Sequence, residues 1–186
     1  MAAAETRILA LGDSLTAGYG LPAGQGFAPQ LEKALKARGH DVRVIDAGVS
    51  GDTTAGGLAR LDWALGDEPQ VAIVELGAND ALRGLDPDQA YRNLDAILTR
   101  LKQKGVRVVL AGMVAPANWG PDYGKRFDAI YRRLAEKHGV AHYPFFLEGV
   151  AKDPGLNLPD GLHPTAEGVA VVVRNILPVV ESVLPK

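Results

Sequence analysis

A few side chains in this sequence could carry out nucleophilic chemistry without a metal ion or a cofactor. The chain has no cysteine and three serines, so the candidates for a nucleophile are few. Ser14 stands where an apolar run ends in a glycine-rich turn, ILALGDSLTAGYG. Such a turn exposes a side chain, although a lone serine there is usually a turn former. Ser14 is therefore a candidate nucleophile whose role depends on partners elsewhere in the chain.

His163 is the residue that could act as the base for Ser14. It lies in a polar loop near the end of the chain, three residues after Asp160. In a tight turn, side chains at positions i and i+3 lie over one another, so Asp160 could bind one ring nitrogen while the other accepts a proton. A surface ion pair would explain the same spacing. The other histidines lie next to helix ends or in an inner strand and are interpreted as structural: His40, His138 and His142.

Hydrolysis of an acyl group also requires hydrogen-bond donors that stabilise the oxyanion. Gly51 has no side chain to cover its backbone N–H, and Asn79 can offer its side-chain amide. The backbone N–H of Ser14 is a third candidate. In isolation Gly51 and Asn79 are ordinary turn residues. Together with Ser14, His163 and Asp160, however, they predict acyl transfer through a serine nucleophile.

The segments between these residues predict an alternating order of strands and helices. Runs rich in β-branched residues are predicted as strands: residues 6–11, 41–47, 71–76, 106–114 and 140–145. Segments with a helical apolar period are predicted as helices: residues 27–38, 54–65, 86–105, 127–138 and 165–184. Asp86 and Pro87 suit the start of the third helix, and Pro178 is expected to kink or shorten the last.

This alternation predicts an α/β fold with three layers, α/β/α, in which a five-stranded parallel sheet carries helices on both faces. In such open sheets, ligands bind outside the carboxyl ends of the strands. The loops that hold Ser14, Gly51 and Asn79 follow the first three predicted strands, and the loop of His163 follows the fifth. We therefore expect the candidate residues to meet at one edge of the sheet.

Length and composition narrow the class of protein. With 186 residues, of which 47% are hydrophobic, the chain is predicted to form a single domain over residues 1–186. Its 20 basic and 22 acidic side chains form no blocks, so neither a nucleic acid nor stable membrane association is expected. No segment approaches the roughly 20 apolar residues of a membrane span. A small molecule is therefore the expected partner.

The sequence resembles the SGNH, or GDSL-type, hydrolases over nearly its whole length. Four blocks match the family in order: Gly12-Asp13-Ser14-Leu15, Gly51 within Val49-Ser50-Gly51-Asp52-Thr53, Gly77-Ala78-Asn79-Asp80, and Asp160-Gly161-Leu162-His163-Pro164. Residues 57–61, 82–84 and 116–118 look like the arylesterase and thioesterase/lysophospholipase subgroup. The sequence departs from the pattern at Asp46, where Asn is common, and at Ala78, where Gly is common and where a methyl group would lie beside the oxyanion site.

The resemblance implies a flavodoxin-like sheet and a serine esterase that acts through an acyl-enzyme on aryl esters, short- to medium-chain acyl esters, thioesters or lysophospholipids. It implies a triad of Ser14, His163 and Asp160, an oxyanion hole formed by Ser14, Gly51 and Asn79, and neither a cofactor nor a metal ion. Related enzymes are usually exported, so residues 1–6 are expected to be the remnant of an export signal. A periplasmic or secreted location is expected, with the cytoplasm as the alternative, and the protein is expected to be a monomer or a small homo-oligomer.

Some features stay open at this stage. Asp13 is interpreted as structural, because an anion beside the nucleophile would oppose the oxyanion. Residues 115–123 are either a wall of the acyl pocket or a plain surface loop. One rival function is a metal-dependent phosphoesterase, whose candidate ligands are Asp13, Asp52, Asp80, Asp160 and His163. The other is a non-catalytic flavodoxin-like module that binds phosphate in the first glycine-rich loop, which leaves Asp160 and His163 unexplained.

Overall fold

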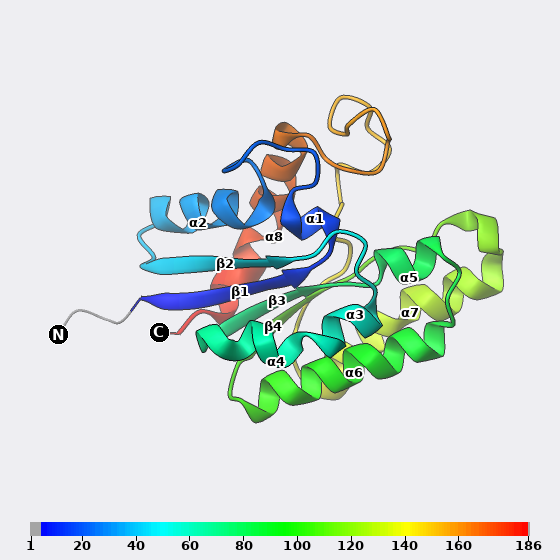
Figure 1. Ribbon diagram of the computed structural model, residues 1–186, viewed down its shortest axis with the longest axis horizontal. Coiled ribbons are helices and arrows are strands. Elements are labelled where there is room, and N and C mark those ends of the chain that lie inside the picture. Colours follow the sequence, from blue (N-terminus) through cyan, green and yellow to red (C-terminus); the bar gives the residue numbers. More distant parts are fainter. Residues whose placement is uncertain (1–4, 186) are drawn as a thin grey trace.

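A five-stranded parallel sheet forms the centre of the molecule (Figure 1). The computed structural model describes residues 5–185, and the strand order is β2-β1-β3-β4-β5. The strands are β1 (Thr6–Gly12), β2 (Val42–Gly48), β3 (Val71–Glu75), β4 (Arg107–Ala111) and β5 (Ala141–Tyr143). This order confirms the predicted flavodoxin-like sheet and makes β1 and β3 neighbours.

The central strands are apolar on both faces because helices cover both faces of the sheet. Every residue of β3 is buried, and β1 is buried from Ile8 onward. Such continuous apolar runs are typical of parallel sheets. One residue departs from this pattern: Glu75, at the end of β3, is a fully buried carboxyl group.

The helices complete the three predicted layers (Figure 1). α2 (Phe27–Ala37) and α8 (Ala166–Val183) pack against each other on one face, whereas α3 (Thr54–Ala59), α6 (Pro87–Gln103) and α7 (Pro121–His138) lie together on the other. The short elements are α1 (Ser14–Ala17), α4 (Leu61–Ala64), α5 (Ala78–Leu82) and the 3₁₀ turns Leu65–Asp67 and Ala117–Trp119. Within residues 5–185, none of the helices has the length and apolar character that a membrane span needs.

The signals that predict α6 from the sequence also stabilise it in the structure. The Asp86 side chain caps the helix by accepting a hydrogen bond from the Asp88 N–H, and Pro87 occupies the first turn. The buried face repeats at helical spacing and consists of Pro87, Ala90, Asn93, Leu94, Ile97, Leu98 and Leu101. The helix predicted over residues 86–105 is thus confirmed, with slightly shorter ends.

Two predicted helices have different bounds in the structure. The helix predicted over residues 54–65 is interrupted at Arg60, whose side chain turns to Asp52 and to the Gly12 carbonyl. The helix predicted over residues 127–138 begins earlier, at Pro121, after Gly120. Residues 121 and 122 are exposed, so the first turn lacks the apolar spacing that reveals a helix in a sequence.

Of the two effects expected of Pro178, a kink or a shorter last helix, the shorter helix is wrong, because α8 runs through Pro178 to Val183. An interior proline costs a helix about 3 kcal/mol. The apolar face of α8 offsets this cost by packing against the core, and its buried residues are Gly168, Val169, Val172, Val173, Ile176, Leu177 and Val180. β4 and β5 are also shorter than predicted, since the chain leaves the sheet after Ala111 and Tyr143.

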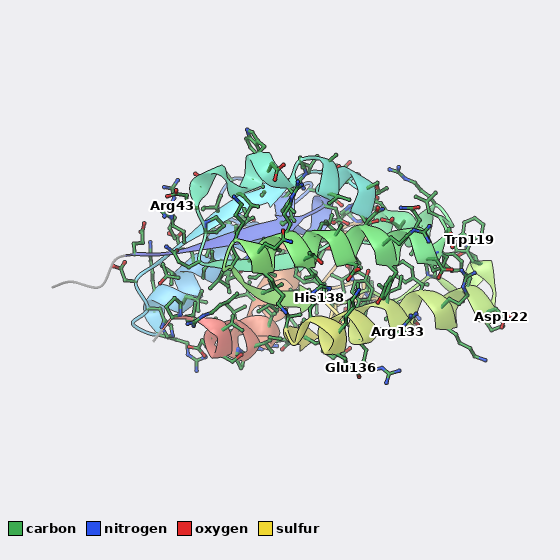
Figure 2. The ribbon with its side chains drawn as sticks, turned by 90° about the horizontal axis from the view of Figure 1, so that it is seen from below. Arg43, Trp119, Asp122, Arg133, Glu136 and His138 are labelled. Atoms are coloured by element: carbon green, nitrogen blue, oxygen red, sulfur yellow. The ribbon has the colours of Figure 1, made fainter. Side chains whose placement is uncertain are left out.

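Of the histidines that the sequence indicates as structural, His142 lies in β5, which is an edge strand and not the predicted inner strand, and the other two pair with carboxylates. His40 Nε2 is 2.9 Å from Glu181 Oε1. His138 ends α7 (Figure 2). Its Nε2 lies 2.6 Å from Asp95 Oδ1 of α6, so the pair joins the two helices. These contacts give His40 and His138 roles in packing.

Candidate active site

Ser14 lies at the start of α1, directly after the central strand β1. Asp13 caps this short helix, and its Oδ1 accepts a hydrogen bond from the Leu15 N–H at 2.9 Å. The parallel register sets Gly12 beside Gly48 on one side and Glu75 on the other. Ser14 therefore leaves the sheet between the ends of β2 and β3, at the edge predicted for the site.

Ser14, His163 and Asp160 form a continuous chain of hydrogen bonds. Ser14 Oγ is 2.9 Å from His163 Nε2, and His163 Nδ1 is 2.6 Å from Asp160 Oδ2. Hydrogen bonds from the His163 N–H, the His163 ring and the Leu162 N–H lower the pKa of Asp160 to about 2. Asp160 is thus an anion at neutral pH and can only accept, so Nδ1 carries the hydrogen and Nε2 is free to accept from Ser14.

The loop that carries Asp160 and His163 is held in shape by its own hydrogen bonds. The Leu158 N–H donates to the His163 carbonyl at 2.7 Å. Asp160 Oδ1 accepts from the Leu162 N–H at 2.9 Å and from the His163 N–H at 3.0 Å. The two oxygens of one carboxylate therefore orient the loop backbone and the imidazole ring at the same time.

Asn79 contacts both neighbouring loops from the start of α5. Its Nδ2 donates to Asp13 Oδ2 at 3.2 Å and to the Asp52 carbonyl at 2.8 Å. Asn79 shares the cavity described below with Ser14, whereas Gly51 is not part of the cavity lining. Gly51 adopts a φ of 85°, a conformation that favours glycine. The Asp52 carbonyl links the Gly51 loop to Asn79.

Arg60 braces the loops that carry Ser14 and Gly51. Its Nε donates to Asp52 Oδ2 at 2.6 Å, and its Nη2 donates to the Gly12 carbonyl at 2.9 Å. Both side chains of the Arg60–Asp52 pair are only 18% exposed, so solvent screens the pair little. The loops after β1 and β2 are therefore held in a fixed relation to each other.

The turn into α5 is held by contacts with α7 and α3. Gly77 has a φ of 119°, and a Cβ there would lie 2.1 Å from the Tyr131 hydroxyl, so only glycine fits. The Tyr131 hydroxyl donates to the Leu76 carbonyl at 2.9 Å. Asp80 accepts from the Thr54 N–H at 2.8 Å and from its hydroxyl at 2.7 Å. These contacts anchor the turn that presents Asn79.

A cavity of about 950 Å³ opens beside Ser14 and His163. The apolar residues that line it are Leu15, Ala78, Ala81, Leu82, Met113, Val114, Ala115, Pro116, Ala117, Phe145, Leu147, Ala151 and Leu162. Residues 115–117 of the loop after β4 thus form a wall of this cavity. The rest of that segment does not, because Trp119 Nε1 donates to the Ala81 carbonyl at 2.8 Å and Pro121 begins α7. Volume and lining are typical of a small-molecule site.

Three residues at the site are not among those predicted from the sequence. The ring of Tyr19 lies 4.5 Å from the ring of His163 and partly covers it. Arg60 braces the loops as described, and Glu75 lies buried beneath them. Tyr19 and Arg60 give no signal in their local sequence that would reveal these contacts. Glu75 does give one, since it is a lone acid in an apolar strand segment.

The carboxylates that the phosphoesterase alternative requires are bound by protein groups. Asp52 pairs with Arg60, Asp160 pairs with His163, and Asp80 accepts from a threonine. Over residues 5–185, no group of three or more His, Asp or Glu side chains is arranged to hold a metal ion. The geometry therefore favours chemistry by Ser14 over chemistry at a metal centre.

Comparison with known proteins points to the same chemistry. The sequence profile of the GDSL-like Lipase/Acylhydrolase family matches residues 10–171. Esterase TesA of Pseudomonas aeruginosa is 41% identical over 184 residues, which is 98% of this chain and 91% of that esterase. An arylesterase of Vibrio mimicus is 43% identical over 165 residues, or 88% of this chain and 82% of the arylesterase. The crystal structure of AlinE4, an SGNH-hydrolase family esterase, is 48% identical with a TM-score of 0.83 and full (100%) coverage of both chains.

Proposed function

The chain belongs to the GDSL-like lipase/acylhydrolase family and is a carboxylic ester hydrolase, and from this premise we propose that Ser14 is its nucleophile, activated by His163 and Asp160. The observation that carries the proposal is the chain of contacts from Ser14 Oγ to His163 Nε2, 2.9 Å, and from His163 Nδ1 to Asp160 Oδ2, 2.6 Å. An activated serine requires a base within hydrogen-bond reach and a third group that orients the base, and both are in place.

The reaction proceeds in two halves through an acyl-enzyme. His163 Nε2 takes the hydroxyl proton while Ser14 Oγ attacks the ester carbonyl, and the Asp160 anion stabilises the imidazolium. The tetrahedral intermediate collapses when His163 gives this proton to the leaving alcohol or thiol. A water molecule then loses a proton to His163 and attacks the acyl-enzyme. Collapse of the second intermediate returns the proton to Ser14 and releases the acid.

The oxyanion of both intermediates is stabilised in this proposal by Asn79, Gly51 and the Ser14 N–H. The two hydrogens of Asn79 Nδ2 point to Asp13 Oδ2 and to the Asp52 carbonyl in the resting structure. The contact with Asp13 is the longer, at 3.2 Å. We expect this N–H to be shared between Asp13 Oδ2 and the oxyanion as negative charge develops, so that Asp13 keeps the amide in place while the contact with the oxyanion tightens in the transition state.

Replacement of Asn79 with alanine should therefore lower kcat by about 10²- to 10³-fold, the usual cost of one oxyanion donor. KM should change little, because the donor acts on charge that the ground state lacks. Steady-state kinetics with a p-nitrophenyl ester measures both. If a correctly folded Asn79→Ala enzyme kept the wild-type kcat, Asn79 would not be an oxyanion donor.

The apolar cavity supports esters with an aryl group or a short- to medium-chain acyl group as substrates, with thioesters and lysophospholipids as related classes. We expect hydrolysis of p-nitrophenyl esters to be unchanged by EDTA and abolished by a serine-directed phosphonate. Activity that EDTA removes and the phosphonate spares would instead support the metal-dependent rival. The same assay over acetate, butyrate, octanoate, palmitate and one acyl-CoA ranks the substrate classes.

A periplasmic or secreted location and a monomer or small homo-oligomer belong to the same proposal. They rest on the family resemblance, and residues 1–4 of the predicted export remnant lie outside the described residues. Cell fractionation and size-exclusion chromatography test them.

A further inference from the structure

Two carboxyl groups are buried together beneath the site and take no part in the mechanism above. Glu75 ends β3 and Asp13 follows β1, and both side chains are 0% exposed. The Asp13 N–H donates to Glu75 Oε2 at 3.4 Å, so the two buried residues are in direct contact. Because a carboxylate can only accept, a hydrogen bond between the two carboxyl groups requires a proton on one of them.

The surroundings of Glu75 disfavour its ionised form. Thr16 Oγ1 donates to Oε2 at 2.8 Å, and Oε1 has no donor among the described residues. A Cβ on Gly12 would lie 2.7 Å from Oε2, so the site is tightly closed. Burial, and next the charge of Asp13, raise the pKa of Glu75 well above its ordinary value. Both oxygens of Asp13 accept hydrogen bonds from N–H groups, whereas Glu75 Oε1 accepts none from the described residues, and this difference favours Glu75 as the group that holds the proton.

Asp13 is connected directly to residues that the proposed reaction uses. Its Oδ1 accepts from the Leu15 N–H, next to Ser14, and its Oδ2 accepts from Asn79. The orientation of the Asn79 amide is settled, because Nδ2 faces two acceptors and the opposite orientation would set oxygen against oxygen. Asp13 thus holds both the nucleophile turn and the oxyanion donor.

Several charged and titratable groups face this pair from neighbouring elements. Burial raises the pKa of Asp13, and the charge of Asp52 adds to this effect. The Leu15 N–H, Glu75 and the charge of His163 lower the pKa, and the balance of these effects is a pKa of about 6. The Arg60 guanidinium binds Asp52 and the Gly12 carbonyl beside the pair. On the far side, the buried Tyr131 hydroxyl donates to the Leu76 carbonyl.

We propose that Glu75 is a positioning residue: as a neutral carboxylic acid it donates its proton in a hydrogen bond to Asp13, and so keeps Asp13 ionised as the acceptor that orients Asn79 and the Ser14 turn. The inference rests on the proposed function, because Asn79 and Ser14 matter through their roles there. Glu75 touches no substrate and acts only through Asp13.

Two substitutions separate this role from simple packing. Glu75→Gln keeps a hydrogen-bond donor to Asp13, whereas Glu75→Leu fills similar space without one. Loss of the donor removes a contribution that lowers the pKa of Asp13, so this pKa rises further. Ionised Asp13 exists above its pKa, so the acid limb of kcat/KM should move to higher pH in Glu75→Leu and stay in place in Glu75→Gln.

The test combines an infrared spectrum with pH profiles of the full chain. The wild-type protein at neutral pH should show the C=O band of a buried carboxylic acid, and Glu75→Gln should lack it. Glu75→Gln should keep kcat within about threefold, and Glu75→Leu should lose about tenfold in kcat through misplaced donors, with little change in KM. The control is Glu32→Gln, which alters a carboxyl group of α2 that accepts from the Val44 N–H and should leave the acid limb in place.

Three results would overturn the proposal. The first is a wild-type spectrum without the band, or a band that survives in Glu75→Gln. The second is a folded Glu75→Leu protein with an unshifted acid limb. The third is a decrease in kcat of about tenfold in Glu75→Gln, as large as the decrease expected for Glu75→Leu. This result would overturn the proposal even if the Glu75→Leu protein does not fold. The infrared band does not depend on ester hydrolysis, so failure of this inference is distinguishable from failure of the proposed function.

Discussion

Replacement of Ser14 with alanine should lower kcat for ester hydrolysis by about 10⁶-fold. The Ser14 hydroxyl lies 2.9 Å from His163 Nε2, and its removal eliminates the acyl-enzyme as well as the nucleophile. The residual rate should come from substrate binding and oxyanion stabilisation alone. KM should change far less, because alanine leaves the apolar cavity intact. Steady-state kinetics with a p-nitrophenyl ester gives both constants.

Ser182→Ala is the matched control for this variant. Ser182 lies in α8, where its hydroxyl donates to the Val179 carbonyl at 2.7 Å. We expect wild-type kcat for Ser182→Ala and an unchanged circular dichroism spectrum for both variants. If Ser14→Ala retained a kcat within about tenfold of wild type, the serine mechanism would be wrong.

Replacement of His163 with alanine should cost kcat about as much as the loss of Ser14, on the order of 10⁶-fold, because the two residues act as a unit. His163 serves both halves of the reaction, first as base for Ser14 and later as base for water. The variant should therefore lose the initial burst of p-nitrophenol together with steady-state turnover. Stopped-flow measurement of the burst separates the two halves.

His40→Ala is the matched control for the histidine. His40 also pairs with a carboxylate, Glu181, but at a helix end outside the cavity. Its removal should leave kcat unchanged. A His163→Ala enzyme with a burst of wild-type rate and amplitude would show that Ser14 is activated by another group.

Much of the fold could be predicted because burial decides the residue types. β3 is buried over its whole length, and α6 repeats its apolar positions over several turns. Short elements lack this information. α1 has four residues, too few to show a period, and the break at Arg60 coincides with a contact to the Gly12 carbonyl, which lies 48 residues away.

The candidate residues could be predicted because each belongs to a short motif: Ser14, Gly51 and Asn79 follow the ends of strands, and Asp160 and His163 lie in the loop before α8. The distant contacts could not. The sequence indicates a structural role for Asp13, and its bond to the Leu15 N–H agrees with this role, but its bond to Asn79 spans 66 residues. The hydrogen bond from the Thr16 hydroxyl to Glu75 likewise joins residues that are 59 positions apart. The sequence around each of these residues gives no signal for a contact with a residue so far away in the chain.

The most direct test of the account is to trap the acyl group. A p-nitrophenyl ester is mixed with the wild-type protein, the reaction is quenched with acid within the burst, and the peptides are analysed by mass spectrometry. The account predicts one acyl group on Ser14, present in Ser182→Ala and absent from Ser14→Ala. An acyl group on any other residue, or turnover without a trapped acyl-enzyme while a burst is observed, would contradict it.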